Sequence, residues 1–206
     1  MYLPNRNLLF IHINKNGGTT VRHHLSNWDN RIISGDYNRI VNGWHYHTPA
    51  IQAQKLLTTQ EWNTSFKFAF VRNPWDRCVS VFHFRKAQKP GFYKDIDFES
   101  WLLSNEEKVC NNLTFGFKSF IDFNFLAPQY YWLLDQNHEM CMDFVGRFEK
   151  FEEDFSQICD LFGQKERILH LNKGSHGNYR QYYSVETRKL VEKIAAVDID
   201  FFGYRF

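Results

Sequence analysis

Residues 8–20 read LLFIHINKNGGTT, and this stretch decides the fold class that the sequence predicts. The apolar run at 8–13 is bounded by polar residues, as expected of a buried strand. A glycine-rich turn with one lysine follows, and a helix is expected from Val21 through Trp28. This order is typical of phosphate sites, because glycines let the backbone approach an anion and the helix N-terminus offers N–H groups. A glycine-rich connection with a solvated lysine is the alternative.

The same alternation of strands and helices continues along the chain. Further strands are expected at 66–71, 144–148 and 168–171. Helices are expected after Asn73, at 128–134 and at 155–162, where Gly163 would cap the C-terminus. A last helix should have Leu190, Val191 and Ile194 on one face. The pattern predicts one domain, residues 1–206, with an α/β, P-loop-like three-layer fold. Its central sheet is mainly parallel and flanked by helices. The aromatic segment 86–137 should hold two or three helices.

Composition limits the class of protein. A net charge of +2 disfavours a nucleic-acid partner, so any anion site must be a local cluster of donors. The four cysteines have no metal-ligand spacing and are expected to be free thiols. No stretch approaches the ~20 apolar residues that span a bilayer, and the N-terminus lacks a signal peptide. We expect a cytoplasmic protein of bacterial or viral origin, or a Golgi lumenal one if an N-terminal anchor has been removed.

A second cluster of candidate site residues lies at 70–80, FVRNPWDRCVS. Arg72 leaves the end of a strand, where ligands bind in open α/β sheets. Asn73 is the expected helix cap with Pro74 in the first turn, and Ser80 lies about two turns further on. A guanidinium and a hydroxyl near a helix start favour a phosphate site. A helix-capping salt bridge with a surface serine is the alternative.

A third cluster is WHYHTPA at 44–50. Thr48 and Pro49 predict a helix start, which places His47 just outside a helix N-terminus. The positive end of the helix dipole disfavours imidazolium, so a neutral base is expected there. His45 is a plausible second participant. A purely structural role for both histidines is the alternative, and His-x-His without a third ligand is a weak metal motif.

These clusters resemble motifs of the sulfotransferases that use PAPS (3′-phosphoadenosine 5′-phosphosulfate), most closely the branch with bacterial and Golgi carbohydrate sulfotransferases. The resemblance extends over residues 11–20, 70–80, 146–155, 171–174 and 182–204, in the family's order. One departure is Asn14, where a proline often stands. This difference should change the stiffness of the loop rather than its ligand chemistry.

The resemblance implies roles for these residues. PAPS would be the donor and PAP the product, with no metal required, and a carbohydrate hydroxyl would be the acceptor, bound through segment 86–137. His47 would be the catalytic base, with Lys15 and His45 as further catalytic residues. The nucleotide would be bound at its 5′ end by Lys15, Asn16, Gly17, Gly18, Thr19 and Thr20, at its 3′-phosphate by Arg72 and Ser80, and by a closing loop with Lys173 and Gly174.

Two other functions are compatible with parts of the pattern. A nucleoside or small-molecule kinase shares the strand–loop–helix order, but Lys15 precedes the glycines, so the P-loop pattern G-x-x-x-x-G-K-[ST] fails. A kinase would also need Mg²⁺ and should ignore a 3′-phosphate. A non-catalytic nucleotide- or glycan-binding module is the second alternative. The presence of Lys15, Arg72, Ser80 and His47 together argues against it.

Overall fold

The structure is a computed structural model and describes residues 1–35, 40–105, 126–165 and 176–206. The chain divides into two compact units. The first unit comprises Met1–Val71 and Tyr131–Lys173, and the second comprises Arg72–Tyr130 and Gly174–Phe206. The expectation of one domain over residues 1–206 stays a prediction.

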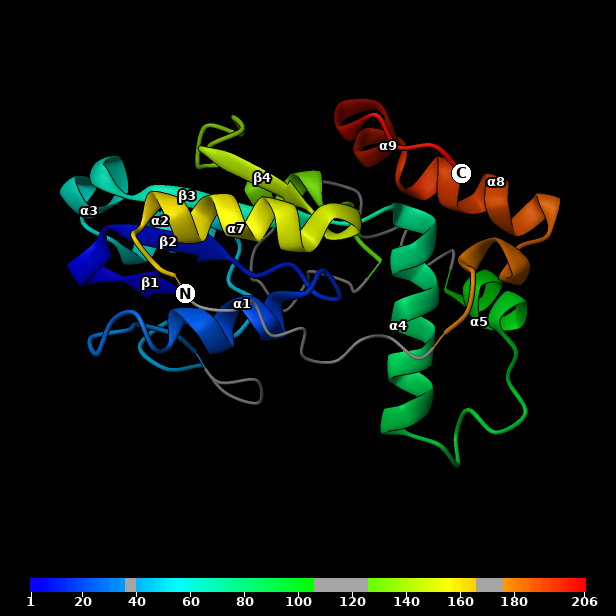
Figure 1. Ribbon diagram of the computed structural model, residues 1–206. Coiled ribbons are helices and arrows are strands. Elements are labelled where there is room, and N and C mark those ends of the chain that lie inside the picture. Colours follow the sequence, from blue (N-terminus) through cyan, green and yellow to red (C-terminus); the bar gives the residue numbers. More distant parts are fainter. Residues whose placement is uncertain (36–39, 106–125, 166–175) are drawn as a thin grey trace. The chain divides into compact units, whose positions relative to one another are not determined.

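A four-stranded sheet forms the centre of the first unit (Figure 1), in the order β1-β2-β3-β4. The strands are β1 (Tyr2–Leu3), β2 (Leu8–Ile11), β3 (Phe66–Val71) and β4 (Phe144–Arg147). β1 runs antiparallel to β2, whereas β2, β3 and β4 are parallel to their neighbours. This arrangement confirms the predicted α/β class with a mainly parallel sheet. β1 was not predicted, because two residues are too few to show periodicity.

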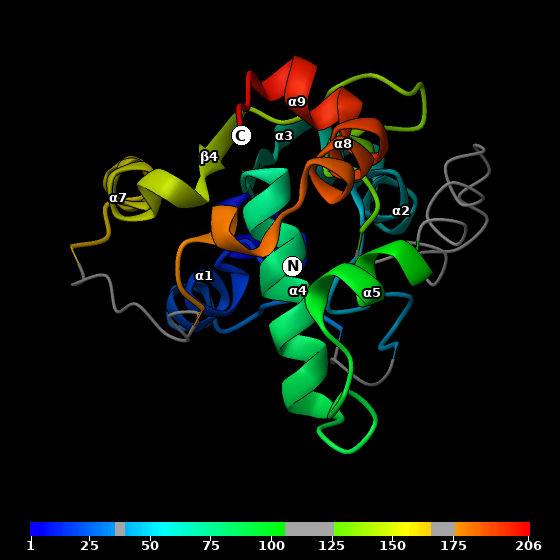
Figure 2. The same ribbon diagram turned by 90° about the vertical axis from the view of Figure 1, so that its right-hand side faces the viewer.

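Helices cover both faces of this sheet, as Figures 1 and 2 show. On one face, the apolar sides of α1 (Gly18–Leu25) and α7 (Phe151–Leu161) join a buried core with Phe10 and Phe68, whose ring centroids are 4.9 Å apart. On the other face lie α2 (Ala50–Leu56) and α3 (Thr59–Thr64). Trp62 is the buried residue of α3. The ammonium of Lys67 lies 4.8 Å from the Trp62 ring centroid. The first unit is therefore layered helix, sheet, helix, as predicted.

The second unit is helical in the residues that the structure describes. It contains α4 (Pro74–Gln88), α5 (Phe98–Ser104), the 3₁₀ turn η5 (Tyr179–Tyr182), α8 (Val185–Ile194) and α9 (Ala196–Phe202). Figures 1 and 2 show α5 and α8 beside α4, and these helices are in contact. The side chain of Asn73 accepts N–H bonds from Trp75 and Asp76, which confirms it as the cap of α4. The predicted inward face of α8 is buried: Leu190, Val191 and Ile194.

Several element boundaries differ from the predicted ones. α1 begins at Gly18, three residues before the predicted start, because Gly17 caps it in the left-handed region at φ 79°. The helix ends at Leu25, before the predicted end at Trp28. Segment 128–134 forms only a 3₁₀ turn, η3 (Tyr130–Leu133), instead of an α-helix. The chain also has short 3₁₀ turns at η1 (Pro4–Arg6) and η4 (Phe148–Lys150). α7 ends as expected, with Gly163 at φ 67° just after it. The predicted strand at 168–171 lies outside the described residues.

Candidate active site

The loop between β2 and α1 is hydrogen-bonded to β3 of the first unit through Asn16. Asn16 is 1% exposed, and its Nδ2 donates a 2.7 Å hydrogen bond to the carbonyl of Phe70 near the end of β3. Lys15 has φ 66°, a left-handed conformation that is uncommon for a residue with a side chain. Thr20 is buried and Thr19 is exposed. The loop thus ends in the N-terminus of an eight-residue helix, with a half-buried lysine three residues before it.

The two glycines of the loop are required by packing. A Cβ placed on Gly18 would lie 1.9 Å from Cδ2 and 2.0 Å from Nε2 of His12, which real contacts do not allow. A Cβ on Gly17 would lie 2.7 Å from the ring of Phe151, at a φ that side chains rarely adopt. The sequence had indicated glycine only for close approach to a phosphate. In the structure, Gly18 also makes room for the His12 ring.

We therefore predict that Gly18→Ala destabilises the fold by about 1–3 kcal/mol, the usual cost of overpacking a buried position. The His12 ring that the added methyl group would meet is buried. Urea unfolding should show a lower midpoint with an unchanged slope. Gly91→Ala is the matched control, since a Cβ there has no neighbour within 4 Å. Equal midpoints for the two variants would contradict the packing argument.

His47 is bonded to the loop through one ring nitrogen. Its Nδ1 lies 2.8 Å from the backbone carbonyl oxygen of His12. A carbonyl only accepts, so Nδ1 carries the proton and donates it. In the neutral ring the basic lone pair is then on Nε2. The structure therefore assigns the tautomer of the predicted base, and Nε2 is the atom that can take a proton from an acceptor hydroxyl.

His45 and Thr48 shape the turn that carries His47. The backbone N–H of His47 donates to Nδ1 of His45 over 3.1 Å. The hydroxyl of Thr48 accepts from the His45 N–H and donates to the His45 carbonyl, both at 2.8 Å. Nδ1 of His45 is thus an acceptor, so in its neutral ring the proton lies on Nε2. This arrangement favours a positioning role for His45 and the role of base for His47.

The predicted helix start at Thr48 is displaced. α2 begins at Ala50 with Pro49 at its N-cap, and no side chain caps it. Thr48 bonds back to His45 instead, because its hydroxyl has both backbone groups of that residue within reach. The orientation of His47 is accordingly set by the His12 carbonyl rather than by capping of α2.

His12 is a buried histidine whose importance the sequence did not reveal. Its ring centroid lies 4.4 Å from that of His47 and 4.6 Å from that of Tyr46. Burial, together with neighbouring His47 and Arg22, holds the pKa of His12 well below its ordinary value. His12 is therefore neutral and places no charge beside the base. In the sequence, the only indication that His12 is buried was its position within the apolar strand run at 8–13.

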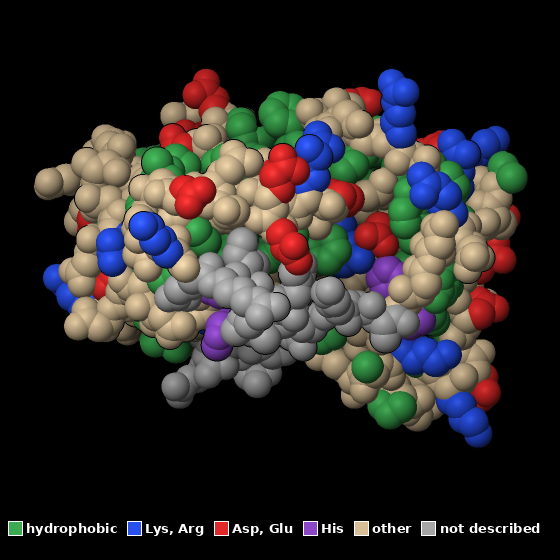
Figure 3. Space-filling model, viewed as in Figure 1, with side chains coloured by type: hydrophobic (Ala, Val, Ile, Leu, Met, Phe, Trp, Pro, Cys, Tyr) green, Lys and Arg blue, Asp and Glu red, His purple; other side chains and the backbone are tan. Residues whose placement is uncertain are grey.

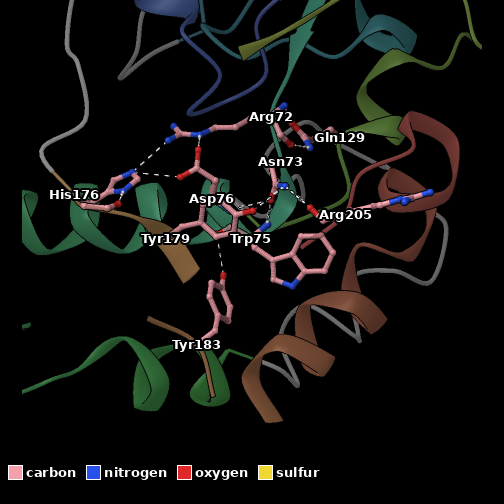
Figure 4. A network of polar contacts seen from close by, with 10 residues as sticks. Arg72, Asn73, Trp75, Asp76, Gln129, His176, Tyr179, Tyr183 and Arg205 are labelled. Carbon is pink, nitrogen blue, oxygen red and sulfur yellow. Dashed lines mark hydrogen bonds and ion pairs between the residues drawn. The ribbon is translucent and has the colours of Figure 1, made fainter. Parts of the chain in front are cut away.

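In the second unit, Arg72 is held at both its backbone and its side chain (Figure 4). It is 5% exposed. Its backbone N–H donates to Oε1 of Gln129 at 2.9 Å, and its carbonyl accepts from Nε2 of the same amide at 2.8 Å. Its Nε bonds Oδ2 of Asp76 at 2.7 Å, and Nη2 lies 3.3 Å from Nε2 of His176. These contacts fix the direction of the guanidinium.

A buried carboxylate supports Gln129. Oδ2 of Asp198 accepts from the backbone N–H and Nε2 of Gln129 at 2.8 and 3.1 Å, and Oδ1 accepts from the Tyr130 N–H at 2.8 Å. Burial raises the pKa of Asp198, while these donors and Arg77 oppose the shift. The sequence did not identify Gln129 or Asp198. The only indication in the sequence was that Asp198 is an acidic residue on the otherwise apolar buried face of α9.

The remaining predicted site residues are placed as follows. Ser80 is 6% exposed on α4, two turns after the Asn73 cap as expected. The structure gathers Lys15 to Thr20, His45 and His47 in the first unit, and Arg72 and Ser80 in the second. Lys173 and Gly174 lie outside the described residues, so their predicted role stays a prediction.

The comparisons with known proteins identify the family of the chain. A model described as the sulfotransferase family matches residues 1–205. The chain belongs to this family. The chain is 27% identical to carbohydrate sulfotransferase 9 of Homo sapiens over 217 residues, which cover 87% of this chain and 48% of the human protein. It therefore spans about half the length of that relative. It is also 30% identical over 115 residues to an uncharacterized protein of Archaeoglobus fulgidus, covering 55% of this chain and 82% of that protein.

The described residues offer neither a metal cluster nor a membrane-spanning helix. Across 1–35, 40–105, 126–165 and 176–206, no three His, Cys, Asp or Glu side chains are grouped so as to hold a metal ion. Within the same ranges, no helix combines the length and apolar character needed to cross a membrane. Three cysteines there are free thiols, as predicted: Cys78, Cys141 and Cys159.

Proposed function

We propose that this sulfotransferase transfers a sulfuryl group from PAPS to a hydroxyl of a carbohydrate, by in-line displacement. The observation that carries the proposal is the 2.8 Å bond between Nδ1 of His47 and the carbonyl of His12. In the neutral ring this bond leaves the basic lone pair on Nε2, and a positioned basic nitrogen is what deprotonation of a hydroxyl needs. The name of the human relative, a carbohydrate sulfotransferase, supports a carbohydrate acceptor.

Each unit supplies donors suited to one of the two anionic groups of such a nucleotide, and we assign the two groups separately. At its 5′ end, the ammonium of Lys15 and the first N–H groups of α1 supply the donors that phosphate groups prefer. For the 3′-phosphate, the donors are the oriented guanidinium of Arg72 and the hydroxyl of Ser80. We also propose that the 5′ end is contacted, through backbone or side-chain groups, by Asn16, Gly17, Gly18, Thr19 and Thr20. A loop with Lys173 and Gly174 would close over the nucleotide.

Each step that the chain's own residues perform follows from these positions. When bound, PAPS supplies the sulfuryl group. His47 accepts the hydroxyl proton at Nε2 as the acceptor oxygen becomes a nucleophile. Lys15 and the N–H groups of α1 stabilise negative charge that develops on the leaving phosphate oxygen. His45 holds the backbone of His47 in place. None of these steps requires a metal. The cytoplasmic location expected from the sequence remains a prediction.

The nucleotide assignment is tested by calorimetric binding of PAP and of ADP without metal. We expect PAP to bind much more tightly than ADP, because only PAP presents a phosphate to Arg72. Arg72→Ala should lower PAP affinity about 10–100-fold, the value of hydrogen bonds to a charged group. Arg31→Ala, at an exposed arginine, is the control and should bind normally.

Equal affinity for PAP and ADP, or a requirement for Mg²⁺, would reject the sulfotransferase proposal and favour the kinase alternative. Tight PAP binding without turnover on any carbohydrate acceptor would instead favour the non-catalytic binding module. Family membership favours sulfotransfer over both.

A further inference from the structure

The Arg72 side chain contacts two groups of different chemistry among the described residues, Asp76 and His176, and the imidazole of His176 can change its charge. Oδ2 of Asp76, four residues further along the chain, accepts a hydrogen bond from Nε of Arg72 at 2.7 Å. His176 approaches Nη2 at 3.3 Å from a segment 104 residues away in the sequence. The His176 side chain is 7% exposed, and its Nε2 lies 3.9 Å from Oδ1 of Asp76.

The hydrogen bonds of His176 assign its tautomer. Nδ1 lies 3.1 Å from the carbonyl oxygen of Gly177, which can only accept, so Nδ1 carries a proton. Nε2 faces a guanidinium N–H, which can only donate, so Nε2 is the acceptor. His176 is therefore a neutral imidazole that accepts a hydrogen bond from Arg72 while no anion is bound.

The Arg72–Asp76 pair by itself offers little net charge to a phosphate dianion. Arg72 carries +1 and Asp76 carries −1, so these two side chains and a neutral His176 together have no net charge. A phosphate monoester brings about −1.5 to −2 charges at pH 7. Proton uptake by His176 would give the group a net positive charge and convert Nε2 from an acceptor into a donor.

Resting on the proposed function, we propose that His176 takes up a proton from solvent when the 3′-phosphate binds at Arg72, and then acts as a further phosphate-binding residue. Nε2 exchanges its bond from Arg72 for an N–H directed at the anion, while Nδ1 keeps its bond to Gly177. Asp76 keeps Arg72 oriented throughout. Proton uptake makes the affinity for a 3′-phosphate rise as pH falls, because the complex binds more protons than its free components.

The other groups around His176 do not take this role. His83 stacks on it, with ring centroids 5.6 Å apart, and its Nε2 lies 2.9 Å from the hydroxyl of Tyr182. Burial, with help from His176 and Lys86, lowers the pKa of His83, so this ring stays neutral. Figure 3 shows histidine side chains in purple near acidic and basic side chains on the face that it views.

The experiment is PAP calorimetry at pH 7 in two buffers of different ionisation enthalpy, which counts protons taken up on binding. We expect wild type to take up more protons than His176→Gln, which can still accept from Arg72 but cannot be protonated. The variant should also lose about tenfold in PAP affinity at the acidic end of a pH series, the value of one charge-assisted bond. His83→Gln, a matched neighbour, should keep the wild-type uptake.

A direct readout does not depend on the variants. Nitrogen-15 spectra of the His176 ring should show the Nδ1–H tautomer in the free protein and imidazolium after PAP is added. One outcome separates the inference from the proposed function. In that outcome PAP binds and Arg72→Ala weakens PAP binding, while the His176 ring stays neutral and wild type takes up as many protons as His176→Gln. The inference is then wrong and the proposed function stands. If PAP does not bind wild type at all, both are wrong.

Discussion

Replacing His47 by alanine is expected to lower turnover about 10²–10⁴-fold, the usual contribution of a general base. The affinity for PAP should stay close to that of wild type, because the ring is assigned to the acceptor hydroxyl and not to the nucleotide. The decisive observation is the bond from Nδ1 to the His12 carbonyl, which leaves Nε2 as the basic atom. Steady-state turnover on a carbohydrate acceptor and PAP calorimetry measure the two quantities separately.

Two companion variants sharpen the His47 test. His23→Ala changes an exposed histidine on α1 and should leave turnover unchanged. His45→Ala removes the acceptor for the His47 N–H and should lower turnover less than His47→Ala, whereas His45→Asn can restore that acceptor. Parallel losses of PAP affinity and turnover in His47→Ala would contradict the role of base. Such a result would instead indicate that the ring supports the loop around Lys15.

Replacing Lys15 by alanine is expected to lower turnover about 10²–10³-fold, as does removal of a donor to an oxyanion. PAP affinity should fall less, because the ammonium matters most while charge develops on the leaving oxygen. Lys15→Met keeps the length of the stem and should reproduce the loss, which ties the effect to the charge. Turnover and PAP binding are again the measurements.

Lys150→Ala is the control for Lys15, because it removes an exposed ammonium whose ion pair with Glu153 spans 3.5 Å at the surface. It should leave both quantities unchanged, as exposed pairs contribute little. If Lys15→Ala lost affinity and turnover by the same factor, Lys15 would bind the ground state and the transition state equally. Its assignment as a catalytic residue would then fail.

Local signals explain why much of the fold and site could be predicted. The run at 8–13, the Asn73–Pro74 pair and the spacing within α8 depend on interactions between residues close in sequence, and each prediction was confirmed. The boundaries of α1 were less accurate, because a glycine in the left-handed region let the helix begin three residues early. The predicted α-helix at 128–134 became a 3₁₀ turn, where Gln129 and Tyr130 bond Asp198.

The sequence by itself determined the α/β class, the order of the sheet's central elements and the candidate residues Lys15, His47 and Arg72. These depend on apolar periodicity, caps and motif spacing, which are local properties of the chain. Only the tertiary structure decided which nitrogen of His47 is basic and which side chains orient Arg72. His12 lies 35 residues from His47, and Gln129 lies 57 residues from Arg72. Contacts at such separations follow from how the elements pack, because hydrogen-bond direction depends on positions in space that no local pattern records.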